Sequence, residues 1–173
     1  SPEFANTNLD IPVIPASIRS VFDMPERRFV IDLGGDERGA LALGQYGDLL
    51  NKEKSLEMLM VVNPYRPMSA DVGGLREIKE EIEAACGVKF TGIVNNSNLG
   101  RETVFDDVEA VRNVVDAASD ELGLPVKMTA IKRELYDEMA VKLEGRLPEM
   151  FSLDIFFPWE NTIIGRTPDK TPI

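Results

Sequence analysis

The sequence predicts an α/β fold built on a mainly parallel, doubly wound sheet with helices on both faces. Four short apolar segments alternate with four longer amphipathic segments along the chain, and this alternation is typical of repeated βα units. The apolar segments are continuous runs, which is the pattern of strands buried on both faces of a parallel sheet. A chain of 173 residues, 43% of them hydrophobic, can bury such a core without disulfides.

The expected elements follow one another as strand and then helix. The strands are expected at Phe29 to Asp32, Met58 to Val62, Phe90 to Val94 and Lys127 to Ile131, with a final strand in the segment FSLDIFF. The helices are expected at Asp36 to Leu50, Ser69 to Ala85, Thr103 to Leu122 and Arg133 to Leu143. Thr103 is the expected N-cap of the third helix, and Gly123 follows that helix as glycine often does.

Two segments without this repeat flank the α/β core, which we expect to span residues 28–157. Residues 1–27 contain four prolines and predict an N-terminal loop segment. Residues 158–173 predict an irregular C-terminal tail. The first four residues, SPEF, are either a remnant of a cloning vector or the native lead-in, and the sequence leaves both origins open.

The charge balance and the residue counts exclude several classes of function. Nineteen basic and thirty acidic residues give a net charge of −11, which disfavours binding to nucleic acid. No apolar run is long enough to predict a membrane span. The single cysteine, Cys86, has no partner for an internal disulfide, so we expect a cytoplasmic protein. The absence of histidine excludes Ser-His-Asp and Cys-His catalysis.

Polar residues stand at three of the expected strand ends. The first strand ends at Asp32 and is followed by Gly34 and Gly35, the second is followed by Asn63 and Arg66, and the third by an asparagine-rich run that begins at Asn95. Parallel sheets bind ligands beyond the carboxyl ends of their strands. The sequence therefore predicts a binding site at this edge of the sheet.

The turn after the first strand does not have the chemistry of a phosphate loop. Gly34 and Gly39 have the glycine spacing of G-x-x-x-x-G-K-[ST], but Ala40 and Leu41 replace the lysine and the hydroxyl residue. Two interpretations of Asp32 remain open. It is either the strand-end acid that holds a magnesium-bound water, followed by mobile glycines, or the cap of the next helix.

Four segments of the sequence carry a resemblance to a known family: FANTNLDIPVIP, FVIDLGGDERGALALGQY, VVNPYRP and TGIVNNSNLGRET. Together they are similar to the C-terminal two-thirds of ATP-binding proteins in the ParA/MinD-like branch of P-loop ATPases (the CobQ/CobB/MinD/ParA nucleotide-binding group). The resemblance covers most of the chain and implies a partial P-loop NTPase-like fold. In that family a strand and a phosphate loop precede the ANTN segment, so we expect the phosphate loop to lie outside this sequence.

The resemblance implies ATP and Mg²⁺ as cofactors of a full-length relative and a role for each candidate residue. Asp32 would be the catalytic acid and would hold Mg²⁺ through water, with Gly34 and Gly35 moving with the γ-phosphate. Asn96, with Asn95 beside it, would read the adenine edge, because an amide both donates and accepts hydrogen bonds. The alternative is that these asparagines close a turn.

Asn63 and Arg66 are the remaining candidates for nucleotide binding. Arg66 would meet a phosphate or a partner's carboxylate, and the alternative is a solvated loop residue.

Two classes of function remain open. The first is a portion of a cytoplasmic switch ATPase that acts as a homodimer on another protein and cannot hydrolyse ATP without its phosphate loop. The second is a non-catalytic α/β binding or scaffold module. The sequence does not identify the client protein.

Overall fold

The computed structural model describes residues 22–24, 26, 28–34, 37–143 and 149–155. Within these residues four strands form an all-parallel sheet in the order β1-β2-β3-β4. The strands are β1 (Leu59–Val62), β2 (Gly92–Asn95), β3 (Val126–Lys132) and β4 (Glu149–Leu153). The α-helices are α1 (Glu37–Gly44), α2 (Gly47–Leu50), α3 (Val72–Cys86), α4 (Phe105–Ala110), α5 (Arg112–Leu122) and α6 (Tyr136–Lys142).

The parallel α/β class and three of the predicted strands are confirmed. β1, β2 and β3 coincide with the three apolar segments that begin at Met58, Phe90 and Lys127. β4 contains the start of the predicted final strand, whose last two phenylalanines lie outside the described residues. Most of the predicted N-terminal loop segment and the whole predicted tail also lie outside them.

Part of the core lies between the sheet and the helices of one face, and a second cluster lies between α1, α2 and α3. Met60 and Val62 of β1 and Ile93 of β2 pack against residues of α3 and α5. Ile131 of β3 packs against α4 and α6, where Met139 is fully buried. These side chains occupy alternate positions along their strands, so one face of the sheet carries the core.

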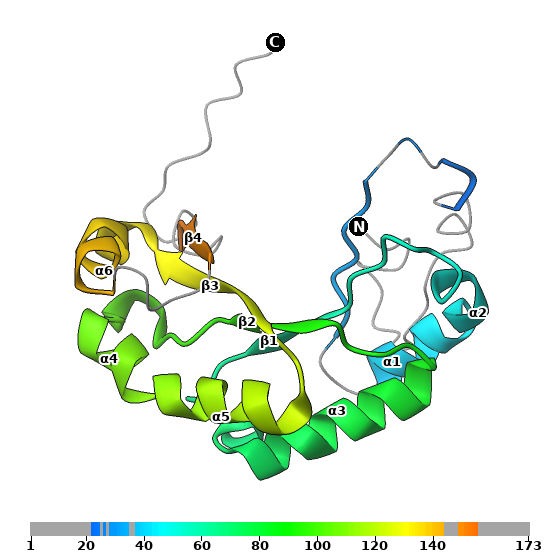
Figure 1. Cartoon of the computed structure of the whole chain (residues 1–173), viewed down its shortest axis with the longest axis horizontal. Helices are drawn as coiled ribbons and strands as arrows, with labels where there is room; N and C mark the ends of the chain where they lie inside the picture. Colours follow the sequence, from blue (N-terminus) through cyan, green and yellow to red (C-terminus); the bar gives the residue numbers. More distant parts are fainter. Residues whose placement is uncertain (1–21, 25, 27, 35–36, 144–148, 156–173) are drawn as a thin grey trace, which may run out of the picture.

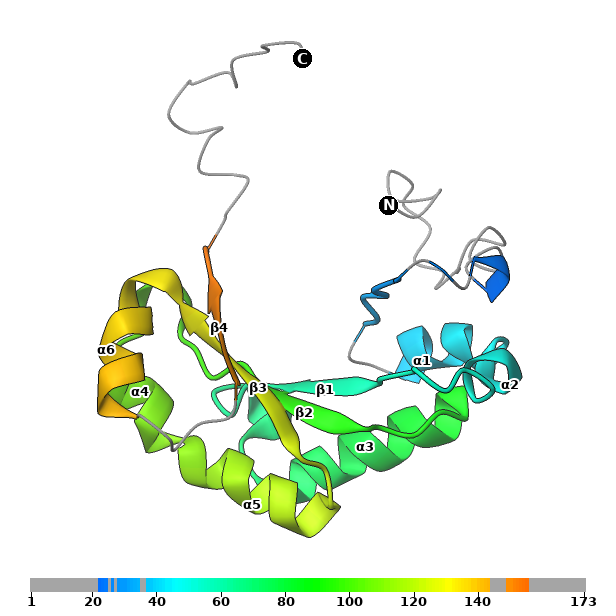
Figure 2. The same cartoon turned by 45° about the horizontal axis from the view of Figure 1, so that its top comes forward.

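The predicted doubly wound arrangement differs from what the described residues form. The strands follow each other across the sheet in chain order, and right-handed connections in that order place every connecting helix on the same face. Figures 1 and 2 show α3 and α5 together on one side of the sheet. On the opposite face Val61 is 64% exposed and Phe151 is 55% exposed.

The prediction of a strand at Phe29 to Asp32 is wrong for this structure. The segment 28–34 has no regular secondary structure, and Phe29, Val30 and Ile31 are exposed, Val30 by 97%. A strand needs a neighbour for its backbone hydrogen bonds. The described residues offer none, because the sheet ends at β1 on that side.

Two of the predicted helices are each divided in two. The chain turns between α1 and α2, where a Cβ on Gly44 or Gly47 would lie 2.7 Å from a backbone oxygen of α3. These glycines therefore allow the corner to approach α3 closely. The third predicted helix is interrupted at Val111, between α4 and α5.

The predicted N-cap of the third helix is also wrong. Val104 is the N-cap of α4 and its N–H donates to Asp107. The Thr103 hydroxyl instead donates to the Gly100 carbonyl. The predicted C-terminal glycine of α5 is confirmed, since Gly123 has a φ of 65°.

Candidate functional site

The loops that follow β1 and β2 meet through the side chain of Asn63. Its Nδ2 donates to the Asn98 carbonyl over 3.0 Å, and its Oδ1 accepts from the Asn98 N–H over 3.3 Å. The same Oδ1 accepts from the Tyr65 N–H over 3.2 Å. The amide of Asn63 is therefore occupied in joining the two loops. It positions the second loop, and its Oδ1, which already accepts two hydrogen bonds, has no lone pair left for an adenine edge.

Asn95 closes the turn at the end of β2. Asn95 is buried, with 2% of the residue exposed. Its Oδ1 accepts from the Ser97 N–H over 3.1 Å and from the Ser97 hydroxyl over 2.6 Å. Asparagine commonly makes this local bond two residues along the chain. For Asn95 the geometry favours the turn interpretation.

Asn96 lines a pocket beyond the strand ends. Its backbone N–H extends the ladder by donating to the Val62 carbonyl over 2.8 Å. The Asn98 Nδ2 donates to the Asn96 backbone carbonyl over 2.7 Å and, at 3.3 Å, to its Oδ1. Within the described part of the chain, none of these bonds uses the Nδ2 of Asn96. This asparagine therefore retains hydrogen-bonding capacity at the pocket.

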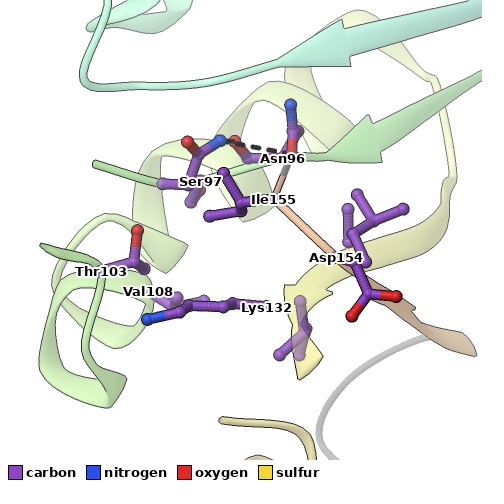
Figure 3. Close-up of a pocket in the computed structure, with 11 residues that line it drawn as sticks. Asn96, Ser97, Thr103, Val108, Lys132, Asp154 and Ile155 are labelled. Carbon is purple, nitrogen blue, oxygen red and sulfur yellow. Dashed lines mark hydrogen bonds between the residues drawn. The ribbon is translucent and has the colours of Figure 1, made fainter. Parts of the chain in front are cut away.

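The pocket has a volume of about 210 Å³ and lies at the carboxyl ends of β2, β3 and β4 (Figure 3). One wall is formed by the loop after β2 with Thr103 and α4, the floor by the end of β3, and the other wall by the end of β4. The lining residues are Asn96, Ser97, Asn98, Thr103, Val108, Ala130, Ile131, Lys132, Leu153, Asp154 and Ile155. Polar groups and aliphatic side chains thus share the lining.

Two charged side chains face this pocket. Lys132 is half-buried, with 21% of its side chain exposed, and its Nζ donates to the Arg101 carbonyl over 2.8 Å. Asp154 is exposed and accepts two hydrogen bonds from Arg133. Those hydrogen bonds lower the pKa of the Asp154 carboxyl and raise the pKa of the Arg133 guanidinium. Asp154 is therefore a carboxylate at neutral pH.

The structure brings Asn63, Asn95 and Asn96 together but does not place the candidate magnesium residue with them. Asp32 is exposed and belongs to the segment 28–34, which lies beside α1 and away from α4 and α6 in both views (Figures 1 and 2). Gly34 lies in the same segment and approaches Gly39 of α1. Gly35 lies outside the described residues.

Arg66 is exposed, and its backbone forms the turn after β1. Its N–H donates to the Asn63 carbonyl over 2.9 Å, and its carbonyl accepts from the Ser69 N–H over 3.0 Å. A role for its guanidinium in phosphate binding stays a prediction.

Magnesium binding by Asp32 also stays a prediction. The described residues contain no group of three or more His, Cys, Asp or Glu side chains that could hold a metal ion. Magnesium sites in nucleotide enzymes use one or two carboxylates together with substrate phosphates and waters, so the lack of such a group does not test the role predicted for Asp32.

Sequence reasoning missed Lys132 and Asp154, which line the pocket, and Arg133, which forms an ion pair with Asp154. A signal was present, because Lys132 and Arg133 stand at the carboxyl end of a predicted strand. Asp154 had no such signal. Its place depends on the pairing of β4 with β3, which brings residues far apart in the sequence to the same edge.

Comparison of the chain with protein-family models, with curated proteins and with solved structures found no match. No helix among the described residues has the length and apolar character needed to cross a membrane. The all-parallel sheet and its helices define the class of the described residues as parallel α/β.

Proposed function

We propose that the pocket at the ends of β2, β3 and β4 binds the adenine base of an adenine nucleotide. The observation that carries the proposal is Asn96 on the lining of a pocket that also has aliphatic walls, with an Nδ2 that donates no hydrogen bond to the residues that the structure describes. A purine is apolar on its two faces and polar at its edge. Small-molecule sites match such a ligand with apolar walls for its faces and a few convergent polar groups for its edge. An amide can both donate to and accept from that edge.

The size of the pocket supports binding of the base rather than of a complete nucleotide. Pockets that enclose drug-sized ligands measure roughly 300 to 1,000 Å³, and this pocket measures about 210 Å³. One flat ring system is therefore the appropriate occupant. The ribose and phosphates would extend outward, past the loops that follow the strands.

The phosphate-binding half would be supplied by a further strand beside β1 in a longer protein. No described strand pairs with the other edge of β1. Phe29, Val30 and Ile31 form an apolar run that is at least 41% exposed at each residue. A strand between this run and β1 would pair with the edge of β1 and cover the apolar side chains of the run. It would also bring a phosphate loop to the edge that carries Asn63 and Asn96. This arrangement agrees with the resemblance to ParA/MinD-like ATPases.

In that context the chain is a portion of a cytoplasmic switch ATPase, with Asp32 as the catalytic acid near Mg²⁺. Such a protein would act as a homodimer on a client protein. Residues 1–173 would not hydrolyse ATP, because the lysine and hydroxyl of a phosphate loop are absent from this sequence.

A non-catalytic binding module is the second candidate function. It is favoured by one observation, namely that Asp32 is exposed in a segment remote from the pocket. In this alternative the pocket binds a small ligand and no chemistry follows.

The test of the proposal is calorimetric titration of the chain with adenosine, guanosine and cytidine. We expect adenosine to bind in preference to the other two nucleosides. The Asn96→Ala variant should lose about tenfold in adenosine affinity, because two hydrogen bonds of roughly 0.5 to 1.5 kcal/mol each are removed. Asn51→Ala is the matched control, since Asn51 is an exposed asparagine whose Nδ2 bonds the Gly87 carbonyl away from the pocket. Equal affinity for all three nucleosides, or an unchanged affinity in Asn96→Ala, would contradict adenine recognition.

A further inference from the structure

Two consecutive basic residues at the end of β3 reach opposite walls of the pocket. The Nζ of Lys132 donates to the Arg101 carbonyl over 2.8 Å, in the loop that leads to Thr103. Arg133 bonds Asp154 at the end of β4. Figure 3 shows the Lys132 side chain extending toward Thr103 and Val108, with Asp154 at the other side of the pocket. Each wall is thus attached to the same strand end.

The contact between Arg133 and Asp154 is bidentate. The Arg133 Nε donates to Asp154 Oδ1 over 2.6 Å, and the Arg133 Nη2 donates to Asp154 Oδ2 over 2.7 Å. This fork geometry fixes orientation as well as distance. Arg133 is not among the residues that line the pocket, whereas Asp154 is. Arg133 therefore acts on the pocket through Asp154.

The wall that this pair holds belongs to an edge strand. Among the described strands β4 pairs with β3 alone, and its residues alternate between exposed and half-buried. Leu153 is the last residue of that pairing, and it lines the pocket together with Asp154 and Ile155, which follow it. An end of an edge strand opens more readily than a central strand. Its position over the pocket then depends on whatever side-chain contact holds it.

The opposite wall is held by more contacts. Thr103 is 3% exposed, its hydroxyl donates to the Gly100 carbonyl and accepts from the Leu99 N–H, and Asn63 ties the neighbouring turn to the loop after β1. The wall at the end of β4 is therefore the adjustable one.

We infer that Arg133 is a positioning residue that holds the end of β4 against the pocket and so determines how tightly the pocket encloses its ligand. This inference rests on the proposed function for the identity of the ligand, but the hold on β4 is a property of the chain alone. The expected effect is modest because both side chains are exposed, at 61% and 69%, and solvent weakens such pairs.

The experiment combines two measurements on wild type, Arg133→Gln, Asp154→Asn and the exchanged double variant Arg133→Asp with Asp154→Arg. Hydrogen exchange of the ligand-free protein measures how readily the end of β4 separates from β3. We expect the amides of residues 152–155 to exchange faster in both single variants and to recover in the double variant. Titration with adenosine reports the pocket, and we expect a loss of about three- to fivefold in each single variant with partial recovery in the double variant.

Arg76→Gln is the matched control, because Arg76 forms an ion pair of 2.7 Å with Glu121 between α3 and α5, with both side chains similarly exposed. It should change neither measurement at the pocket.

Unchanged exchange in Arg133→Gln would overturn the inference whatever the ligand. Faster exchange with unchanged adenosine affinity would overturn the link between the wall and the pocket. If wild type binds no adenosine, the proposed function fails, and the exchange data still decide whether Arg133 holds β4.

Discussion

Glu83 is a carboxylate buried on α3, with a residue exposure of 5%. Its Oε2 pairs with Lys89 at 2.7 Å and with Lys79 at 3.2 Å, and its Oε1 accepts from the Phe90 N–H at 3.0 Å. Burial alone would raise the pKa of Glu83, but the hydrogen bonds from Lys89, Phe90 and Lys79 outweigh burial and lower it. The side chain therefore fastens the end of α3 to the segment that enters β2.

Replacing Glu83 by Gln should destabilise the protein by about 1 to 3 kcal/mol at neutral pH, because charge-assisted bonds to a buried group are lost. The pKa of Glu83 is lower in the folded than in the unfolded chain, so its stabilisation is present above the unfolded value of about 4.5 and is lost as the pH falls through the folded value. Urea unfolding of wild type and variant from about pH 7 to about pH 3 should show the difference shrinking.

The exposed Glu80 on the same helix is the control, and Glu80→Gln should change stability little at any pH. A difference between wild type and Glu83→Gln that persists undiminished in acid would contradict the assignment of the effect to the carboxylate.

For the asparagines at the strand ends, the sequence predicts their position but not their hydrogen bonds. The sequence predicts that Asn63, Asn95 and Asn96 lie at one edge, because parallel strands end on the same side. It does not predict which amide stays available. That depends on turn geometry. The side chain of Asn95 bonds Ser97 and that of Asn63 bonds Asn98, whereas Asn96 lines the pocket.

At the scale of elements, strand prediction succeeds where a neighbouring strand exists. The segments that form β1, β2 and β3 are continuous apolar runs, and each finds a parallel partner. The run at Phe29 to Asp32 has the same composition but no partner among the described residues. Periodicity reports the capacity of a segment to form a strand, and pairing decides whether it does.

The edge strand β1 offers a direct test of which side chains the sheet buries. Val61 is 64% exposed and Val62 is 1% exposed. Val61→Lys should leave the free energy of unfolding within about 0.5 kcal/mol of wild type and should reduce self-association, because lysine discourages pairing at sheet edges. Val62→Lys should prevent folding, since it buries an unpaired charge. Urea unfolding and size-exclusion chromatography measure both effects.

Equal destabilisation by the two lysines would show that Val61 is covered in solution. The face of β1 opposite the helices would then be covered in solution.

At the scale of the whole molecule, the order of the strands in the sheet determines where the helices and the pocket lie. Four strands in chain order place the connecting helices on one face and the carboxyl ends of β2, β3 and β4 around a pocket. The sequence predicts the parallel sheet and the edge that carries the site, because both follow from βα repetition. It does not predict the pocket itself, because the pocket depends on β4 and its contact with Arg133.

We propose that this chain carries the base-binding half of an adenine-nucleotide site without the phosphate-binding half. Calorimetric titration with adenosine and with ATP, each with and without Mg²⁺, tests it most directly. We predict weak binding of both ligands with affinities within about tenfold of each other, no gain from Mg²⁺ and a loss in Asn96→Ala, because a net charge of −11 and a missing phosphate cradle offer the phosphates no attraction. Tight, Mg²⁺-dependent binding of ATP, or binding of neither ligand, would contradict the account.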